Sequence, residues 1–203
     1  MATITISAKD VQELRQRTGA GMMECKKALE ETKGDVEKAI ELLRKKGIAK
    51  AEKRAGREAS EGQITSYIHH NGKVGVLVEV NCETDFVGRN EEFKSLARSI
   101  AEHIAGASPV PVAVSKDQVS AETVERERRI FTEQAKASGK PDAIVQKMVD
   151  GRIDKFYKEV TLLEQPWIRD DSKTIGDLVR EATAKMGENI VVRRFARFKI
   201  GEE

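Results

Sequence analysis

The side chains with the greatest chemical potential in this chain of 203 residues are three histidines and two cysteines. His69 and His70 are adjacent, so at the end of a strand they would point to opposite faces and could not hold one metal ion. His103 falls within a predicted helix and is expected to be an ordinary residue of its flank. Cys25 and Cys82 form no CxxC or Cys/His cluster, which argues against zinc, a disulfide framework and a dithiol centre. We expect no metal site and two reduced, structural thiols.

Motifs of the common enzyme classes are also absent from the sequence. It contains no GxxxxGKS/T phosphate loop, no GxSxG nucleophile elbow and no HExxH zinc motif. No nucleophile is spaced with a base, and no carboxylate pair stands out. The chain is therefore predicted not to be an enzyme and to need no cofactor.

The most distinctive segment is NCETDFVGRN at residues 81–90, which follows a predicted strand and precedes a predicted helix. Junctions of this kind carry function more often than the interiors of elements do. Judged from residue types alone, Phe86 and Val87 are more often core residues, with Asp85 as a local turn cap. The alternative is an aromatic displayed at a rigid corner to anchor a partner, with a carboxylate beside it. Residue types leave both readings open.

Three short helices are predicted in residues 1–47, each with apolar residues at helical spacing. A core this small is marginal alone, so the surface of the unit is expected to serve docking. We interpret it as a ubiquitin-associated-like helical domain. The residues that begin or end its helices are Ser7, Asp10, Gly19, Gly34, Asp35 and Gly47.

Residues 48–61 are small and charged, and are expected to be a linker. A solvated connector is favoured over an RNA contact because glutamates interrupt the basic residues. Residues 62–203 are predicted to form an α+β core and dimerisation domain. Two β-rich runs flank Asn71-Gly72, a dipeptide suited to a tight hairpin turn with two positive φ angles. A third strand at residues 189–200 completes an antiparallel sheet, covered by helices at about 91–105 and from Thr174 onward.

A charged helical hairpin is predicted as an insertion at about residues 120–160, broken by the sequence SGKP. Its apolar seam is sparse, so we expect it to project from the body as a spacer or a second contact arm. The predicted seam consists of Val124, Phe131 and Ala135 on the first helix and Ile144, Met148, Ile153 and Phe156 on the second.

The charge balance and hydropathy restrict the possible partners. Thirty-six basic residues nearly balance 34 acidic ones, and a net charge of +2 gives no long-range field for nucleic acid. Direct binding of nucleic acid is therefore not expected. No apolar run approaches the roughly 20 residues that a membrane span needs, and the N-terminus has no secretion signal. A cytoplasmic protein without membrane contact is expected.

Two long segments of the sequence are LRQRTGAGMMECKKAL at residues 14–29 and EVNCETDFV at residues 79–87. They resemble the first and the second signature of the elongation factor Ts family. The likeness extends through ENIVVRR at residues 188–194, and the single copy of the sheet unit resembles the short form of the family. Gly88 departs from the pattern, because the family usually has Ala or Ser there.

The resemblance implies a guanine-nucleotide exchange factor for the GTPase EF-Tu. The Thr-Asp-Phe-Val corner would insert near the magnesium and phosphate site of EF-Tu and displace the nucleotide, and the factor would remain bound until GTP binds. A homodimer formed through the sheet would give a two-to-two complex with EF-Tu. The implied contact residues are Thr84, Asp85, Phe86 and Val87 at the corner, Leu14, Arg15, Thr18, Gly19, Met22 and Met23 on the N-terminal unit, and His69 or His70 for a second EF-Tu domain.

A different class of function also fits residues 1–60. The N-terminal unit and linker could form an adaptor that binds the ribosome, a nascent chain or RNA without exchange activity. This alternative leaves the corner and the sheet without a role. A steep dependence of RNA affinity on salt would favour it.

Overall fold

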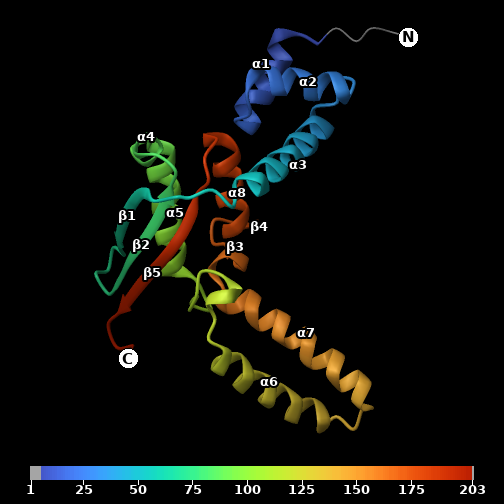
Figure 1. Ribbon diagram of the computed structural model, residues 1–203, viewed down its shortest axis with the longest axis vertical. Coiled ribbons are helices and arrows are strands. Elements are labelled where there is room, and N and C mark those ends of the chain that lie inside the picture. The colour runs from blue at the N-terminus through green and yellow to red at the C-terminus, as the bar shows by residue number, and fades with distance from the viewer. Residues whose placement is uncertain (1–5, 203) are drawn as a thin grey trace.

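The computed structural model describes residues 6–202 and shows an α+β chain with three-helix, sheet and hairpin parts (Figure 1). Residues 1–5 of the predicted N-terminal domain, and residue 203, lie outside the described part. The first part comprises α1 (Ala8–Thr18), α2 (Met22–Glu31) and α3 (Val36–Arg54). Its core is formed by Val11, Leu14, Cys25, Ala28, Leu29 and Ala39. The three predicted helices are present, while the ubiquitin-associated likeness stays a prediction.

The third helix does not end at Gly47 as predicted, but continues to Arg54. The reason is tertiary packing against α8 (Ile175–Met186). A Cβ atom at Gly47 would lie 3.4 Å from the Cβ of Ala184, and Ala51 is buried. Part of the predicted linker at residues 48–61 is therefore helical. Its Ala, Lys, Glu and Arg residues favour a helix, and packing against α8 stabilises it there.

The main sheet consists of β1 (Glu61–Ile68), β2 (Val74–Cys82) and β5 (Val191–Lys199), all antiparallel in the order β1-β2-β5. Val76, Val78 and Val80 point to one face and are buried there. The helix α5 (Glu91–Gly106) covers this face with an apolar stripe, and α8 packs beside it (Figure 1). The predicted three-stranded sheet and its covering helices are confirmed.

The hairpin between β1 and β2 is confirmed, but its turn differs from the prediction. Among residues 6–202 only Gly72, with φ 69°, has a positive φ angle in this turn. Its N–H donates to the carbonyl of His69 over 2.8 Å, and the N–H of His69 donates to Val74. The loop between β1 and β2 is therefore longer than a two-residue turn. Both histidines lie in this loop, after the end of β1.

Short elements connect the sheet to the rest of the chain. A single turn, α4 (Asp85–Gly88), follows β2, and short 3-10 turns occupy Lys116–Gln118 and Leu162–Glu164. A small sheet of β3 (Pro166–Trp167) and β4 (Asp170–Thr174) precedes α8. This sheet was not predicted, because its strands are too short to show a periodic pattern in the sequence.

The hairpin helices α6 (Ala121–Lys136) and α7 (Asp142–Val160) project from the base of the sheet, at the opposite end of the long axis from α1 and α2 (Figure 1). The predicted seam is wrong in part. Val145 and Val149 are buried in it, whereas Ile144 is 46% exposed and Phe156 is half-buried. None of the helices within residues 6–202 has the length and apolarity of a membrane span.

Candidate partner-binding site

The residues 84–87 form a corner directly after β2, and their side chains point in different directions. Phe86 is 80% exposed, whereas its neighbour Val87 is only 6% exposed and packs into the core under α5. Thr84 begins the turn, and its Oγ1 accepts a hydrogen bond from the N–H of Val87 at 3.4 Å. Asp85 is exposed and forms an ion pair of 2.8 Å with Arg89. The structure therefore displays Phe86 and Asp85 and uses Val87 as an anchor in the core.

A carboxylate from the other end of the chain holds this corner. Glu188 lies in the loop between α8 and β5, and its Oε2 accepts hydrogen bonds from the N–H groups of Glu83 and Thr84, at 3.1 and 3.0 Å. Its Oε1 accepts a third bond from the Thr84 hydroxyl at 2.6 Å. Glu188 was not predicted to be a site residue. Its only signal was its place within the segment that resembles the elongation factor Ts family.

The inner side of the corner is closely packed. The Cys82 thiol donates to the Thr84 carbonyl over 3.1 Å. Burial raises the pKa of this thiol, and the nearby Glu188 carboxylate raises it further. A Cβ atom at Gly88 would lie 3.5 Å from both Cys82 Sγ and Gly62 Cα, an ordinary contact distance. Both cysteines are buried and free, as predicted.

The predicted contact residues of the N-terminal unit separate into exposed and supporting groups. Met22 and Met23 are 41% and 65% exposed at the start of α2, and Arg15 is exposed on α1. Leu14 is completely buried, so its side chain supports the unit and cannot reach a partner in this conformation. The Thr18 hydroxyl, half-buried, donates to the Leu14 carbonyl over 2.7 Å.

Gly19 closes α1 in the left-handed region with φ 68°. A Cβ atom there would lie 3.1 Å from the side chain of Lys185 on α8, so the α1–α2 loop touches the core at this point. This placement gives Gly19 a local structural role whether or not it also contacts a partner.

The adjacent histidines do not lie on a strand as assumed. They follow β1, and their ring centroids are 4.2 Å apart. The Nδ1 atom of His69 is hydrogen-bonded to the Tyr67 hydroxyl at 3.1 Å, whereas His70 is exposed. Within residues 6–202, no three His, Cys, Asp or Glu side chains are grouped to hold a metal ion.

His103 is not the ordinary flank residue that was expected. The residue is 1% exposed. The Nε2 atom lies 2.9 Å from Gln165 Oε1, and Nδ1 accepts a hydrogen bond of 3.3 Å from the N–H of Ile168. These partners assign the proton of the neutral ring to Nε2. The Gln165 amide group donates to the carbonyls of Pro109 and Glu159, so the network fastens the base of the hairpin to α5.

The outer face of the sheet is largely apolar and uncovered within the described residues, and it is crossed by one ion pair, Arg194–Glu79 at 2.6 Å. Cross-strand pairs place Ser66, Leu77 and Ala196 in one row, with Gly75 and Phe198 paired in the next. The large exposed side chains of this face and its margin are Ile64, Ile68, Leu77, Phe198 and Ile200. An exposed apolar patch on an antiparallel sheet is typical of a protein interface.

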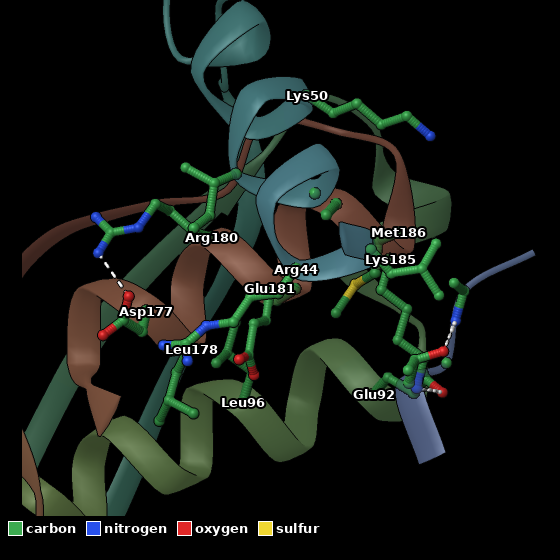
Figure 2. Close-up of a pocket in the computed structure, with 18 of the residues that line it drawn as sticks. Arg44, Lys50, Glu92, Leu96, Asp177, Leu178, Arg180, Glu181, Lys185 and Met186 are labelled. Atoms are coloured by element: carbon green, nitrogen blue, oxygen red, sulfur yellow. Dashed lines mark hydrogen bonds and ion pairs between the residues drawn. The ribbon is translucent and has the colours of Figure 1, made fainter. Parts of the chain in front are cut away.

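A groove of about 990 Å³ separates the N-terminal helices from the core. Figure 2 shows Arg44 of α3 on one wall and Glu92 of α5 on another. Ion pairs line it, including Arg180–Asp177 at 2.8 Å and Lys185–Glu92 at 2.7 Å (Figure 2). The two apolar cores stay separate on either side. The N-terminal unit is therefore joined to the core along α3 and beside Gly19.

Comparisons with known proteins agree along nearly the whole chain. The family model described as Elongation factor TS matches residues 2–202. The Elongation factor Ts of Desulforamulus reducens is 58% identical over 197 residues, which cover 97% of this chain and 90% of that protein. That of Fervidobacterium nodosum is 56% identical over 197 residues, covering 97% and 99%. That of Oleidesulfovibrio alaskensis is 58% identical over 201 residues, covering 99% and 100%.

Proposed function

This chain belongs to the elongation factor Ts family of translation elongation factors, and we propose that it is the guanine-nucleotide exchange factor of the GTPase EF-Tu. The observation that carries this proposal is the corner at the end of β2. A large aromatic side chain, Phe86, stands 80% exposed on a turn that is fastened on its inner side by Val87 and Glu188. An exposed aromatic fixed in this way is suited to fill a partner's pocket, because little conformational freedom is lost on binding.

Phe86 acts as a wedge in the GTPase domain, near the magnesium and phosphate site of EF-Tu. Asp85, exposed beside it, perturbs a neighbouring element of the partner. Magnesium is displaced, the phosphate loop is distorted and GDP leaves, without any covalent bond being broken. A pocket-filling Phe can contribute roughly 2 to 4 kcal/mol to such an interaction, which is the usual range for an interface hot spot.

The exchange cycle follows from differential binding. The factor binds nucleotide-free EF-Tu more tightly than the GDP form, so it weakens GDP binding, and incoming nucleotide expels the factor by the same coupling. A shift of about 10⁴-fold in GDP affinity requires about 5.5 kcal/mol of differential binding. Phe86 together with a second contact surface can supply this amount.

The second surface is the exposed start of α2. Met22 and Met23 are adaptable apolar side chains, and both are exposed. In Figure 1, α2 lies at one end of the long axis, and α4 lies in the same half of the molecule. Arg15 adds a charge on the neighbouring helix, and Thr18 lies at its end. One of His69 and His70 contacts another domain of EF-Tu.

Two copies of the chain pair through the outer face of the sheet, and each copy binds one EF-Tu. The exposed Leu77 and Phe198 lie on that face, and an isologous pair of such faces closes by twofold symmetry. The resulting two-to-two complex leaves both corners free for EF-Tu.

Multiple-turnover exchange tests the proposal. EF-Tu loaded with a fluorescent GDP analogue is mixed with excess GTP and a much smaller amount of the chain, and the fluorescence decay is followed. Release of more analogue than there is chain, at a rate proportional to the chain added, is the expected result. A decay equal to the spontaneous rate contradicts the exchange function.

A further inference from the structure

The turn α4 has too little structure of its own to hold Phe86 in one place. It spans only Asp85–Gly88, and a single helical turn is not stable without external contacts. Its own cap, from the N–H of Val87 to Thr84 Oγ1, is long at 3.4 Å. The orientation of the exposed Phe86 therefore depends on the buried Val87 that follows it and on what fastens the residues before the turn.

Glu188 supplies that fastening with a half-buried carboxylate. Three donors converge on it, namely the N–H groups of Glu83 and Thr84 and the Thr84 hydroxyl. Within residues 6–202 no Lys, Arg or His forms an ion pair with Glu188, so these neutral donors stabilise its charge. Hydrogen bonds to a charged group are stronger than those between neutral groups.

Glu188 is itself held from the opposite side. Its neighbour Asn189 is buried, and the N–H of Asn189 donates to Glu83 Oε1 over 2.6 Å. Each segment thus offers a carboxylate to the backbone of the other. The Asn189 side chain donates to the Arg57 carbonyl at 2.7 Å, and Arg57 in turn lies 3.4 Å from Glu83. The loop before β5 is therefore anchored to the end of α3 as well as to the corner.

We infer that Glu188 is a positioning residue for nucleotide exchange, which presents Phe86 to the partner by fixing the backbone at Glu83 and Thr84. This inference rests on the proposed exchange function. Glu188 acts through hydrogen bonds with the chain's own backbone and not through its charge on the partner. The wedge therefore enters its pocket without first being ordered.

The test compares Glu188→Ala with Glu188→Gln in GDP release from EF-Tu at increasing concentrations of the chain. Glutamine can still offer an oxygen to both N–H groups, while its amide faces the Thr84 hydroxyl, which can accept instead of donate. We expect Glu188→Ala to lower kcat about tenfold with KM within about twofold of wild type, since the loss falls on the step that the wedge drives. Glu188→Gln should retain kcat within about threefold of wild type.

A matched control is Glu181→Ala on α8, which removes an exposed carboxylate paired with Lys173 and should leave both constants unchanged. Circular dichroism shows whether each variant is folded. If Glu188→Ala does not fold, Thr84→Val is the substitute: it keeps Glu188 but removes the 2.6 Å bond and the long cap to the N–H of Val87, and it should also lower kcat. A second measurement uses the double variant Glu188→Ala/Phe86→Ala. Its kcat should equal that of Phe86→Ala alone, because Glu188 acts only through Phe86.

The outcomes separate the inference from the proposed function. If wild type does not accelerate release, the exchange function fails. If wild type is active and folded Glu188→Ala has the same kcat, only the positioning role fails. Equal losses in Glu188→Gln and Glu188→Ala also overturn it, because they assign the effect to the charge. Additive losses with Phe86→Ala contradict it too, because Glu188 would then act independently of the wedge.

Discussion

Phe86 and Val87 are neighbours in the chain, yet the first is 80% exposed and the second is 6% exposed. The turn α4 divides them, so that one side chain is displayed to solvent while the next is buried in the core under α5. This division separates the proposed binding role of Phe86 from the stabilising role of Val87 within a single dipeptide. The two roles can therefore be tested by separate substitutions.

Val87→Ala should destabilise the fold, whereas Phe86→Ala should not. Removing two buried methyl groups and leaving a cavity costs about 1 to 2.5 kcal/mol of unfolding free energy. Truncating an exposed side chain changes it by less than about 0.5 kcal/mol. Urea unfolding of both variants measures this. A large loss of stability in Phe86→Ala would show that the ring supports the fold.

Gly88→Ala should stabilise the chain by about 0.4 to 1 kcal/mol, because alanine restricts the unfolded chain and fits the folded one. The new Cβ would make contacts of 3.5 Å with Cys82 and Gly62. Gly62→Ala is the opposing control and should destabilise the chain. Gly62 has a φ angle of 137°, and a Cβ atom there would lie 2.2 Å from the Val80 carbonyl oxygen. Thermal unfolding compares them, and a lower melting temperature for Gly88→Ala contradicts this account of the corner.

Leu77→Glu should convert the proposed dimer to a monomer by placing a charge in the middle of the exposed sheet face. Sedimentation velocity should give twice the chain mass of 22.6 kDa for wild type and the mass of one chain for the variant. Ile144→Glu changes an equally large exposed residue on α7 and should remain dimeric. A dimer that survives Leu77→Glu places the interface elsewhere.

Acidification from pH 7 to 5 should weaken the fold through His103. Burial lowers the pKa of His103, although its hydrogen bond with Gln165 opposes this shift. The unfolded chain binds a proton near a pKa of about 6.5, whereas the folded chain binds it only at a lower pH. Stability that is present above a pH of about 6.5 is therefore lost as the pH falls, by up to about 1.4 kcal/mol per pH unit.

Urea unfolding at both pH values measures the loss. His103→Phe should be less stable at pH 7, because Gln165 and Ile168 lose a partner, but should lose less on acidification. His70→Gln, at an exposed site, should follow wild type. An equal loss in His103→Phe assigns the pH dependence to other groups.

Periodic patterns and caps predicted most of the fold. The alternation of Val76, Val78 and Val80 gave the buried face of β2, and the capping box at Thr174 gave the start of α8. The Gly72 turn was placed correctly as a hairpin. These features are local, so the residues that determine them lie close together in the chain.

Features that depend on contacts between distant residues were not predictable. Gly47 is helical because α8 packs on it, and His103 is buried by partners at least 62 residues away. Residue types alone favoured Phe86 as core, since aromatic rings usually are. Its exposure follows from the turn that Glu188 holds from 104 residues away.

The most direct test of the wedge is stopped-flow release of a fluorescent GDP analogue from EF-Tu by wild type, Phe86→Ala and Val112→Ala. Val112 is an exposed apolar residue away from the corner, and its variant should match wild type. Circular dichroism should show that Phe86→Ala is folded. Its acceleration of GDP release should be smaller than that of wild type by a factor of about thirty or more. Equal acceleration by folded Phe86→Ala and wild type would contradict the account.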